Sequence, residues 1–96
     1  MNKYLITGYE WFDKTNGNSY FSCRIEQITK EGTKLIAKLP FQYGYGEHYR
    51  QQAYKQLVEM GKAKEEDRFN HDLNHKRFIF VKHENQLKRE VLRQGI

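Results

Sequence analysis

Aromatic and basic side chains alternate along the first half of the chain in a pattern that places them on one side of a β-sheet. Successive side chains of a strand point to opposite faces, so residues two apart share a face. Exposed rings on a strand surface can stack on nucleic-acid bases, and neighbouring Lys and Arg side chains can contact phosphates. The predicted face consists of Tyr9, Trp11, Tyr20, Ser22, Arg24, Lys34, Ile36 and Lys38, with Glu26 as an acidic member.

Two other interpretations of this face stay open. The last strand or helix of the chain could cover it, in which case the rings belong to a core. It could also contact a protein, because Tyr, Trp and Arg dominate the energetics of protein interfaces. A second basic surface is predicted on a helix, where Arg50 and Lys55 lie on its polar side.

Other chemistries have weaker support. His71 and His75, with Asp72, have the spacing of metal ligands on a helix, but a third ligand would have to come from His48, His83 or Cys23. The segment Gly44-Tyr45-Gly46 precedes a predicted helix but matches no phosphate-binding motif. Cys23 falls within a predicted strand, where a thiol acts as a small apolar group. We therefore expect no catalytic residue, no metal site and no cofactor.

Composition indicates a small folded domain with a basic surface. The 96 residues include 17 Lys and Arg against 12 Asp and Glu, which gives a net charge of +5 and favours acidic partners. Seven Tyr, six Phe and one Trp argue against disorder. One cysteine excludes an internal disulfide, and no apolar run is long enough to span a membrane. We expect one domain over residues 1–96, located in the cytoplasm.

Three strands are expected before the first helix. An Asn16-Gly17 turn predicts a hairpin with Phe12 opposite Phe21 and Gly8 opposite Ile25. A loop at residues 30–32 predicts a second hairpin, with three facing pairs: Phe21 and Phe41, Cys23 and Leu39, and Ile25 and Ala37. One face then collects the predicted core, with Glu10 as its one charged member. This core comprises Ile6, Phe12, Phe21, Cys23, Ile25, Leu35, Ala37, Leu39 and Phe41.

The second half predicts two helices and a fourth strand. Tyr49, Ala53, Leu57 and Met60 form an apolar stripe along a helix over residues 47–60, and Gly61 is expected to end it. Residues 62–70 are expected to be a loop and residues 71–75 a turn. A strand is predicted over residues 77–83 and a helix over residues 86–94, with Asn85 as its N-cap. The expected fold is α+β, in the order βββαβα: an antiparallel sheet of a three-strand meander plus a fourth strand, packed by one main helix.

The residues Tyr9 to Tyr20, followed by Leu39 to Gly46, resemble small accessory proteins encoded by bacteriophages. The resemblance covers about the first half of the chain and implies no activity or catalytic residue. It implies a setting within a bacterial host, where such proteins act stoichiometrically on host machinery, including as inhibitors of CRISPR and other defence complexes.

The sequence therefore predicts a non-catalytic binder of nucleic acid or of a host nucleoprotein complex. Its candidate residues are Tyr9, Trp11, Tyr20, Arg24, Lys34, Lys38, Arg50 and Lys55. One alternative is an inhibitor that binds only a host protein, or a homodimeric interaction module, through the same sheet face or the helix. A metal-dependent nuclease is a third possibility, based on the four histidines.

Overall fold

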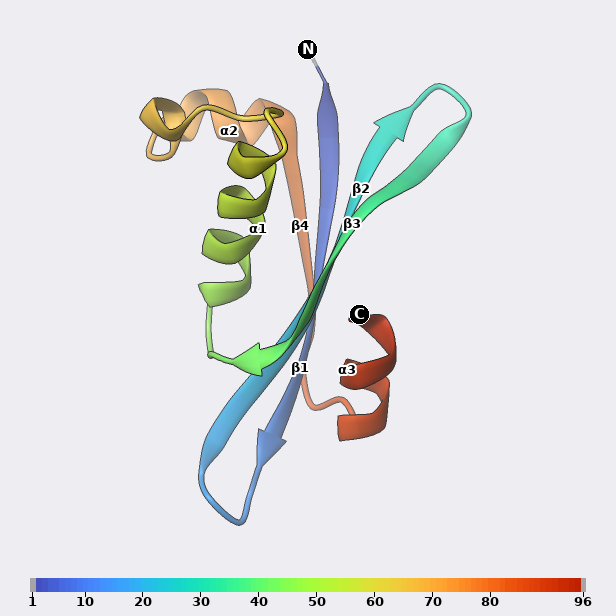
Figure 1. Cartoon of the computed structure of the whole chain (residues 1–96), viewed down its shortest axis with the longest axis vertical. Coiled ribbons are helices and arrows are strands. Elements are labelled where there is room, and N and C mark those ends of the chain that lie inside the picture. The colour runs from blue at the N-terminus through green and yellow to red at the C-terminus, as the bar shows by residue number, and fades with distance from the viewer. Residues whose placement is uncertain (1, 96) are drawn as a thin grey trace.

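The computed structural model describes residues 2–95 and contains one sheet with helices on both of its faces (Figure 1). The long helix α1 lies on one face, called here the α1 face, and the short helix α3 lies on the opposite or α3 face. The elements in chain order are β1 (Lys3–Asp13), β2 (Asn18–Thr29), β3 (Gly32–Tyr43), α1 (His48–Glu59), the 3-10 helix η1 (Glu65–Asp67), α2 (His71–Arg77), β4 (Phe78–His83) and α3 (Lys88–Gln94).

The sheet has four strands in the order β3-β2-β1-β4. The three-strand meander is antiparallel, whereas β4 pairs with β1 in the parallel direction, so the complete sheet is mixed. The α+β class and the element order βββαβα are confirmed. The first strand of the chain is thus an inner strand, and β3 and β4 form the two edges.

The first hairpin turns through four residues rather than two, and the predicted register was wrong by two positions. Phe12 lies opposite Ser19, and Gly8 lies opposite Cys23. The Asp13 carboxylate organises the turn by accepting hydrogen bonds from the backbone N–H of Thr15 at 3.0 Å and from the Asn16 side chain at 2.8 Å. A slip of two residues keeps every side chain on its predicted face, because the side-chain period of a strand is two.

Two β-bulges in the second hairpin move several side chains to the face opposite the predicted one. The central pairs, Cys23 with Leu39 and Ile25 with Ala37, are confirmed. The register then shifts on both sides, so Phe21 lies opposite Gln42 rather than Phe41. One shift lies next to Pro40, which has no N–H to donate and is tolerated at bulges and edges.

The predicted core therefore loses three members. Leu35 pairs with Glu26 on the α3 face and is 41% exposed, and Phe41 packs against Tyr20 on that same face. Phe12 is 45% exposed near the tip of the first hairpin. A bulge adds one residue to one strand only, so it reverses the facing of every later residue of that strand.

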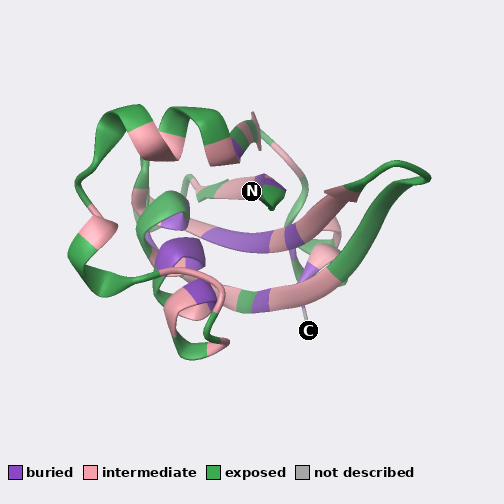
Figure 2. Ribbon diagram, turned by 90° about the horizontal axis from the view of Figure 1, so that it is seen from above, coloured by how far each residue is buried: buried purple, intermediate pink, exposed green. Residues whose placement is uncertain are grey.

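The main core lies between α1 and the sheet, as the apolar stripe predicted. Tyr49, Ala53 and Leu57 are buried against the strands. Figure 2 shows this arrangement, with the buried part of the helix turned towards the buried middle of the sheet. The sheet contributes Tyr4, Ile6, Phe21, Cys23, Ile25, Leu39 and Phe78.

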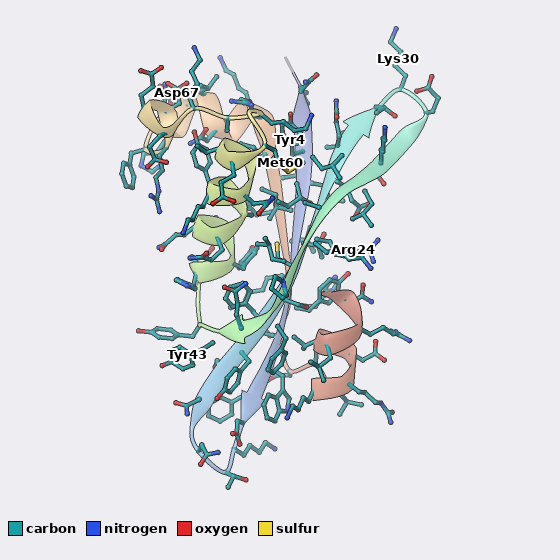
Figure 3. The ribbon with its side chains drawn as sticks, in the orientation of Figure 1. Tyr4, Arg24, Lys30, Tyr43, Met60 and Asp67 are labelled. Atoms are coloured by element: carbon teal, nitrogen blue, oxygen red, sulfur yellow. The ribbon has the colours of Figure 1, made fainter. Side chains whose placement is uncertain are left out.

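The C-terminal helix α3 covers the middle of the opposite face. Val91 of α3 is fully buried, as is Ser22 of β2. Arg24 extends on this side of the sheet, away from α1, and its guanidinium donates a 3.0 Å hydrogen bond to the side-chain oxygen of Gln94 (Figure 3). The predicted N-cap was wrong: Leu87 precedes the helix, while Asn85 has a positive φ of 57° in the loop before it.

The connection between α1 and β4 contains more structure than predicted. Residues 65–67 form a 3-10 helix, and the predicted turn at residues 71–75 is part of helix α2. Asn70 caps α2 by accepting a hydrogen bond from the backbone N–H of Leu73. None of the helices among residues 2–95 has both the length and the apolar character needed to cross a membrane.

Glu10, the charged residue on the predicted core face, forms an ion pair with a residue that is distant in sequence. Its carboxylate lies 3.5 Å from the Lys82 ammonium, and both side chains are mostly buried. Lys82 also donates a hydrogen bond to the backbone carbonyl of Gly46 and lies 3.3 Å from the Glu84 carboxylate. One lysine of β4 therefore joins β1, the segment before α1 and the loop that leads to α3.

Candidate functional site

Four aromatic rings gather on the α3 face near the end of the sheet and form what we call the aromatic cluster: Trp11, Tyr20, Phe41 and Tyr43. Tyr20 and Phe41 stack with their ring centroids 5.2 Å apart. Trp11 packs against Tyr20 at 5.6 Å, and Tyr43 meets Tyr20 edge to face at 5.8 Å. Each ring comes from the end of β1, β2 or β3, so the hairpin registers hold the cluster together.

The aromatic cluster is not sealed from solvent. Trp11, Tyr20 and Phe41 are half-buried, and Tyr43 is 58% exposed. Helix α3 covers the middle of this face: at its start the Lys88 ammonium lies 5.2 Å from the centroid of the Trp11 ring, and at its end Gly95 lies against the backbone of Phe41. The interpretation in which these rings form a closed core therefore does not describe this end of the sheet.

A hollow of about 320 Å³ lies beside Trp11, between the tip of the first hairpin and the loop before α3. It is lined by the indole ring of Trp11, one lysine, two amide side chains and two exposed apolar side chains. Such a lining offers a surface for stacking together with hydrogen-bonding groups and a positive charge. The lining residues are Trp11, Phe12, Lys14, Asn85, Gln86 and Leu87.

The charges around the aromatic cluster are predominantly positive. Among residues 2–95, no carboxylate forms an ion pair with Lys14, Lys38 or Lys88. Asp13 follows Trp11 and Phe12 on β1, and the pKa of its carboxyl is lowered mainly by the hydrogen bond from the Asn16 side chain, with a smaller effect of the Lys88 charge. This carboxylate is occupied in holding the turn, so the lysines remain available to an anionic partner.

The structure brings together most of the residues predicted on this face and separates two, Lys34 and Ile36, the second of which packs against the core on the α1 side. Trp11 and Tyr20 join the aromatic cluster, while Tyr9 stacks on His83 with the centroids 5.1 Å apart. Lys38 lies opposite Arg24 in the register. Lys34 was placed on the wrong face, because the bulge pairs it with Gln27 on the α1 side.

The second predicted basic surface lies on the other side of the molecule and is partly neutralised. The Arg50 guanidinium lies 4.3 Å from the centroid of the Phe80 ring and forms an ion pair with Glu47. Lys55 is exposed on the same helix. Arg50 also lines a hollow of about 410 Å³ between α1, α2 and β4, together with His71, Asp72, Asn74, His75, Phe78 and Phe80. Arg50 and Lys55 therefore belong to a surface separate from the aromatic cluster.

Among residues 2–95, neither the histidines nor Cys23 lies in an arrangement typical of a metal site or of a catalytic nucleophile. Within residues 2–95, no three His, Cys, Asp or Glu side chains are grouped as ligands of a metal ion. Burial raises the pKa of the Cys23 thiol to about 12, which keeps it protonated at neutral pH. Cys23 is completely enclosed in the core between α1 and the sheet.

Six residues of the site were not among the predicted ones: Phe41, Tyr43, Lys14 and Lys88, together with Asn85 and Gln86 of the loop before α3. Phe41 and Tyr43 were missed because the bulge near Pro40 is not visible in the alternation of the strand. Lys14 belongs to the turn of the first hairpin. Its position directly after Asp13, three residues beyond Trp11, could have indicated that it lies near the Trp11 end of the sheet. Lys88 comes from a distant segment, and its position over Trp11 depends on the path of the loop before α3.

Comparisons of the chain with models of protein families, with curated proteins and with solved structures find no match.

Proposed function

We propose that this protein is a non-catalytic binder of single-stranded nucleic acid, free or within a nucleoprotein complex, and that the hollow beside Trp11 receives a base. The observation that carries the proposal is the placement of a half-exposed indole between two unpaired lysines, at the mouth of a hollow lined by amide groups. Stacking on an aromatic side chain contributes roughly 1–3 kcal/mol per base, and lysines track the neighbouring phosphates.

The contacts suggest how the strand would bind. Lys88 covers the Trp11 ring through a flexible, exposed side chain, so a base can take its place on the ring. The displaced ammonium then moves to an adjacent phosphate, and Lys14 contacts a phosphate on the other side of the hollow. The side chains of Asn85 and Gln86 supply donors and acceptors for a base edge. The bases of a duplex are stacked and paired, so a single strand fits this arrangement better.

The resemblance to bacteriophage proteins adds a setting to this proposal. In that setting the bound strand belongs to the nucleic acids or nucleoprotein complexes of a bacterial host, and the protein acts stoichiometrically. Inhibition of a host defence complex is one consequence that binding of this kind could have.

The single tryptophan of the chain is a built-in reporter for the test. Titration of an unlabelled oligothymidine of about 20 nucleotides should quench its fluorescence, and log Kd should depend steeply on log salt. In the variant Lys14→Ala/Lys88→Ala we expect the salt slope to fall by about 1.4, because each phosphate contact to a single strand contributes about 0.7.

The matched control is Lys30→Ala/Lys64→Ala, which removes the same charge from exposed positions outside the aromatic cluster, in the loop between β2 and β3 and before η1. This variant should keep the salt slope of the wild type. Equal losses in both variants would show that only the net charge matters. An absence of quenching and binding at low salt would refute the proposal, and recovery of a specific protein after nuclease treatment would then favour a protein partner.

A further inference from the structure

The edge strand β4 has apolar side chains on both faces, although only one of its faces is covered. Phe78 and Phe80 pack towards the core, where Phe78 is 5% exposed. Ile79 and Val81 point to the α3 face and are 53% and 37% exposed. Continuous apolar runs of this kind are typical of strands that are covered on both faces.

The outer side of β4 also lacks hydrogen-bond partners. The strand pairs only with β1, and among residues 2–95 the other backbone hydrogen bonds of β4 are limited to its first residue, Phe78, whose N–H donates to the Asn74 carbonyl at the end of α2. An unpaired strand edge is a template on which another strand can add. Lys82 is the one lysine in β4, and it is held towards Glu10 and Gly46 instead of guarding the edge.

The opposite edge of the same sheet is protected in three of the ways that proteins use against edge-to-edge pairing. Strand β3 contains Pro40, it carries Lys34 and Lys38, and its pairing with β2 is interrupted by two bulges. The contrast between the two edges indicates that β4, and not β3, is available for pairing.

We propose that β4 pairs with β4 of a second copy of the chain in the antiparallel direction, with the twofold axis at Phe80. This register places Ile79 opposite Val81 of the partner subunit, and the symmetry repeats the contact. Four β-branched side chains that are exposed in the monomer then form one apolar cluster, and such cross-strand pairs stabilise sheets.

Charge complementarity favours a second copy over an unrelated strand. Lys76 and Arg77 immediately precede β4, and Glu84 immediately follows it. Antiparallel pairing brings the basic start of one strand near the acidic end of the other. Lys76 and Glu84 are both exposed in the monomer and would approach each other at both ends of the interface.

The symmetry of this pairing determines where the candidate sites lie. The twofold axis runs through the sheet from face to face, so the two sheets become one sheet of eight strands. Both α3 faces then look in the same direction, and the two hollows beside Trp11 share one side of the dimer. In this respect the inference extends the proposed function, because a single strand could contact both subunits.

The test measures the mass of the protein by light scattering or sedimentation over concentrations from about 1 to 500 µM, because an interface of this limited size is expected to be weak. The wild type should shift from its monomer mass of 11.6 kDa to twice that value. The variant Ile79→Lys should remain a monomer throughout, because a charged side chain at a strand edge opposes pairing.

The matched control is Leu35→Lys, which introduces the same charge at an exposed apolar position of the β3 edge and should dimerise like the wild type. Amide hydrogen exchange should slow with concentration in residues 79–83 and remain unchanged in β3. A monomeric wild type at the highest concentration would overturn the proposal, as would equal dimerisation of Ile79→Lys. Neither result affects base binding beside Trp11, so the two proposals fail separately.

Discussion

Gly8 is the position at which helix α1 comes closest to the sheet. A Cβ atom added there would lie 2.7 Å from Cδ2 and 2.8 Å from Cγ of the Tyr49 ring. Ordinary carbon contacts are about 3.5–4.0 Å, so the ring or the helix would have to move by most of an ångström. Both residues are buried, and the ring has no solvent-facing space into which it can turn.

We therefore expect Gly8→Ala to reduce the free energy of unfolding. Overpacking of a core costs about 1–3 kcal/mol, and the preference of a strand for Ala over Gly returns about 0.5–1 kcal/mol. The expected net loss is about 1–2 kcal/mol. For a domain of this size it corresponds to a Tm lower by about 4–16 °C.

A double-mutant cycle with Tyr49→Ala, measured by urea unfolding, tests the cause. Tyr49→Ala alone should cost about 3–5 kcal/mol because it leaves a cavity. In that background the clash is gone, so Gly8→Ala should be neutral or slightly stabilising, with a coupling energy of about 1–3 kcal/mol. A cost of Gly8→Ala that is the same in both backgrounds would refute this explanation.

Two further predictions concern buried polar chemistry. Burial raises the pKa of the Cys23 thiol from 9.0 to about 12. The stability that the buried, protonated thiol contributes is therefore fully present below about pH 9, and it is lost as the pH rises towards 12. Urea unfolding should therefore show that the wild type loses about 1.4 kcal/mol more stability between pH 7 and pH 10 than Cys23→Ala does; identical pH profiles would contradict this. Lys82→Met leaves Glu10 without its partner and removes a hydrogen bond to Gly46, so we expect a loss of about 1–3 kcal/mol in thermal or urea unfolding. The double variant Glu10→Leu/Lys82→Met should lose less than the single one, and a larger loss would show that the ion pair is not the cause.

The element order and the main core could be predicted because they depend on local signals. The apolar stripe of α1 repeats at helical spacing, and the glycine-containing turns separate three strands of alternating pattern. These signals identify Tyr49, Ala53 and Leu57 as buried, and the structure agrees. The four-residue turn left the predicted faces of β1 and β2 intact, because the register error was an even number.

The faces of β3 could not be predicted beyond its centre, because a bulge has no reliable signature in a single sequence. Pro40 was the one available indication that the alternation is broken there. The consequences reach the site directly, since the bulges bring Phe41 to Tyr20 and take Lys34 away from Arg24.

Long-range contacts were equally inaccessible from local patterns. Glu10 and Lys82 are separated by most of the chain, and so are Trp11 and Lys88. Each pair forms because β4 lies beside β1 in the parallel direction. The spacing of apolar residues in the sequence does not indicate which strand β4 pairs with, nor in which direction. The candidate site was therefore half predictable: its rings on β1 and β2 follow from alternation and Lys14 belongs to the local hairpin turn, while the place of Lys88 depends on the tertiary fold.

The position of β1 has a consequence for how the chain folds during synthesis. This strand is synthesised well before its parallel neighbour β4, which begins with Phe78, the residue that pairs with Tyr4. Pairing over such a separation is slow, because a long loop must close before any contact is gained. Until then one side of β1 remains unpaired, and the nascent first half is vulnerable to aggregation or to chaperone capture. The meander of β1 to β3 thus becomes the complete four-stranded sheet only after β4 (Phe78–His83) has been synthesised.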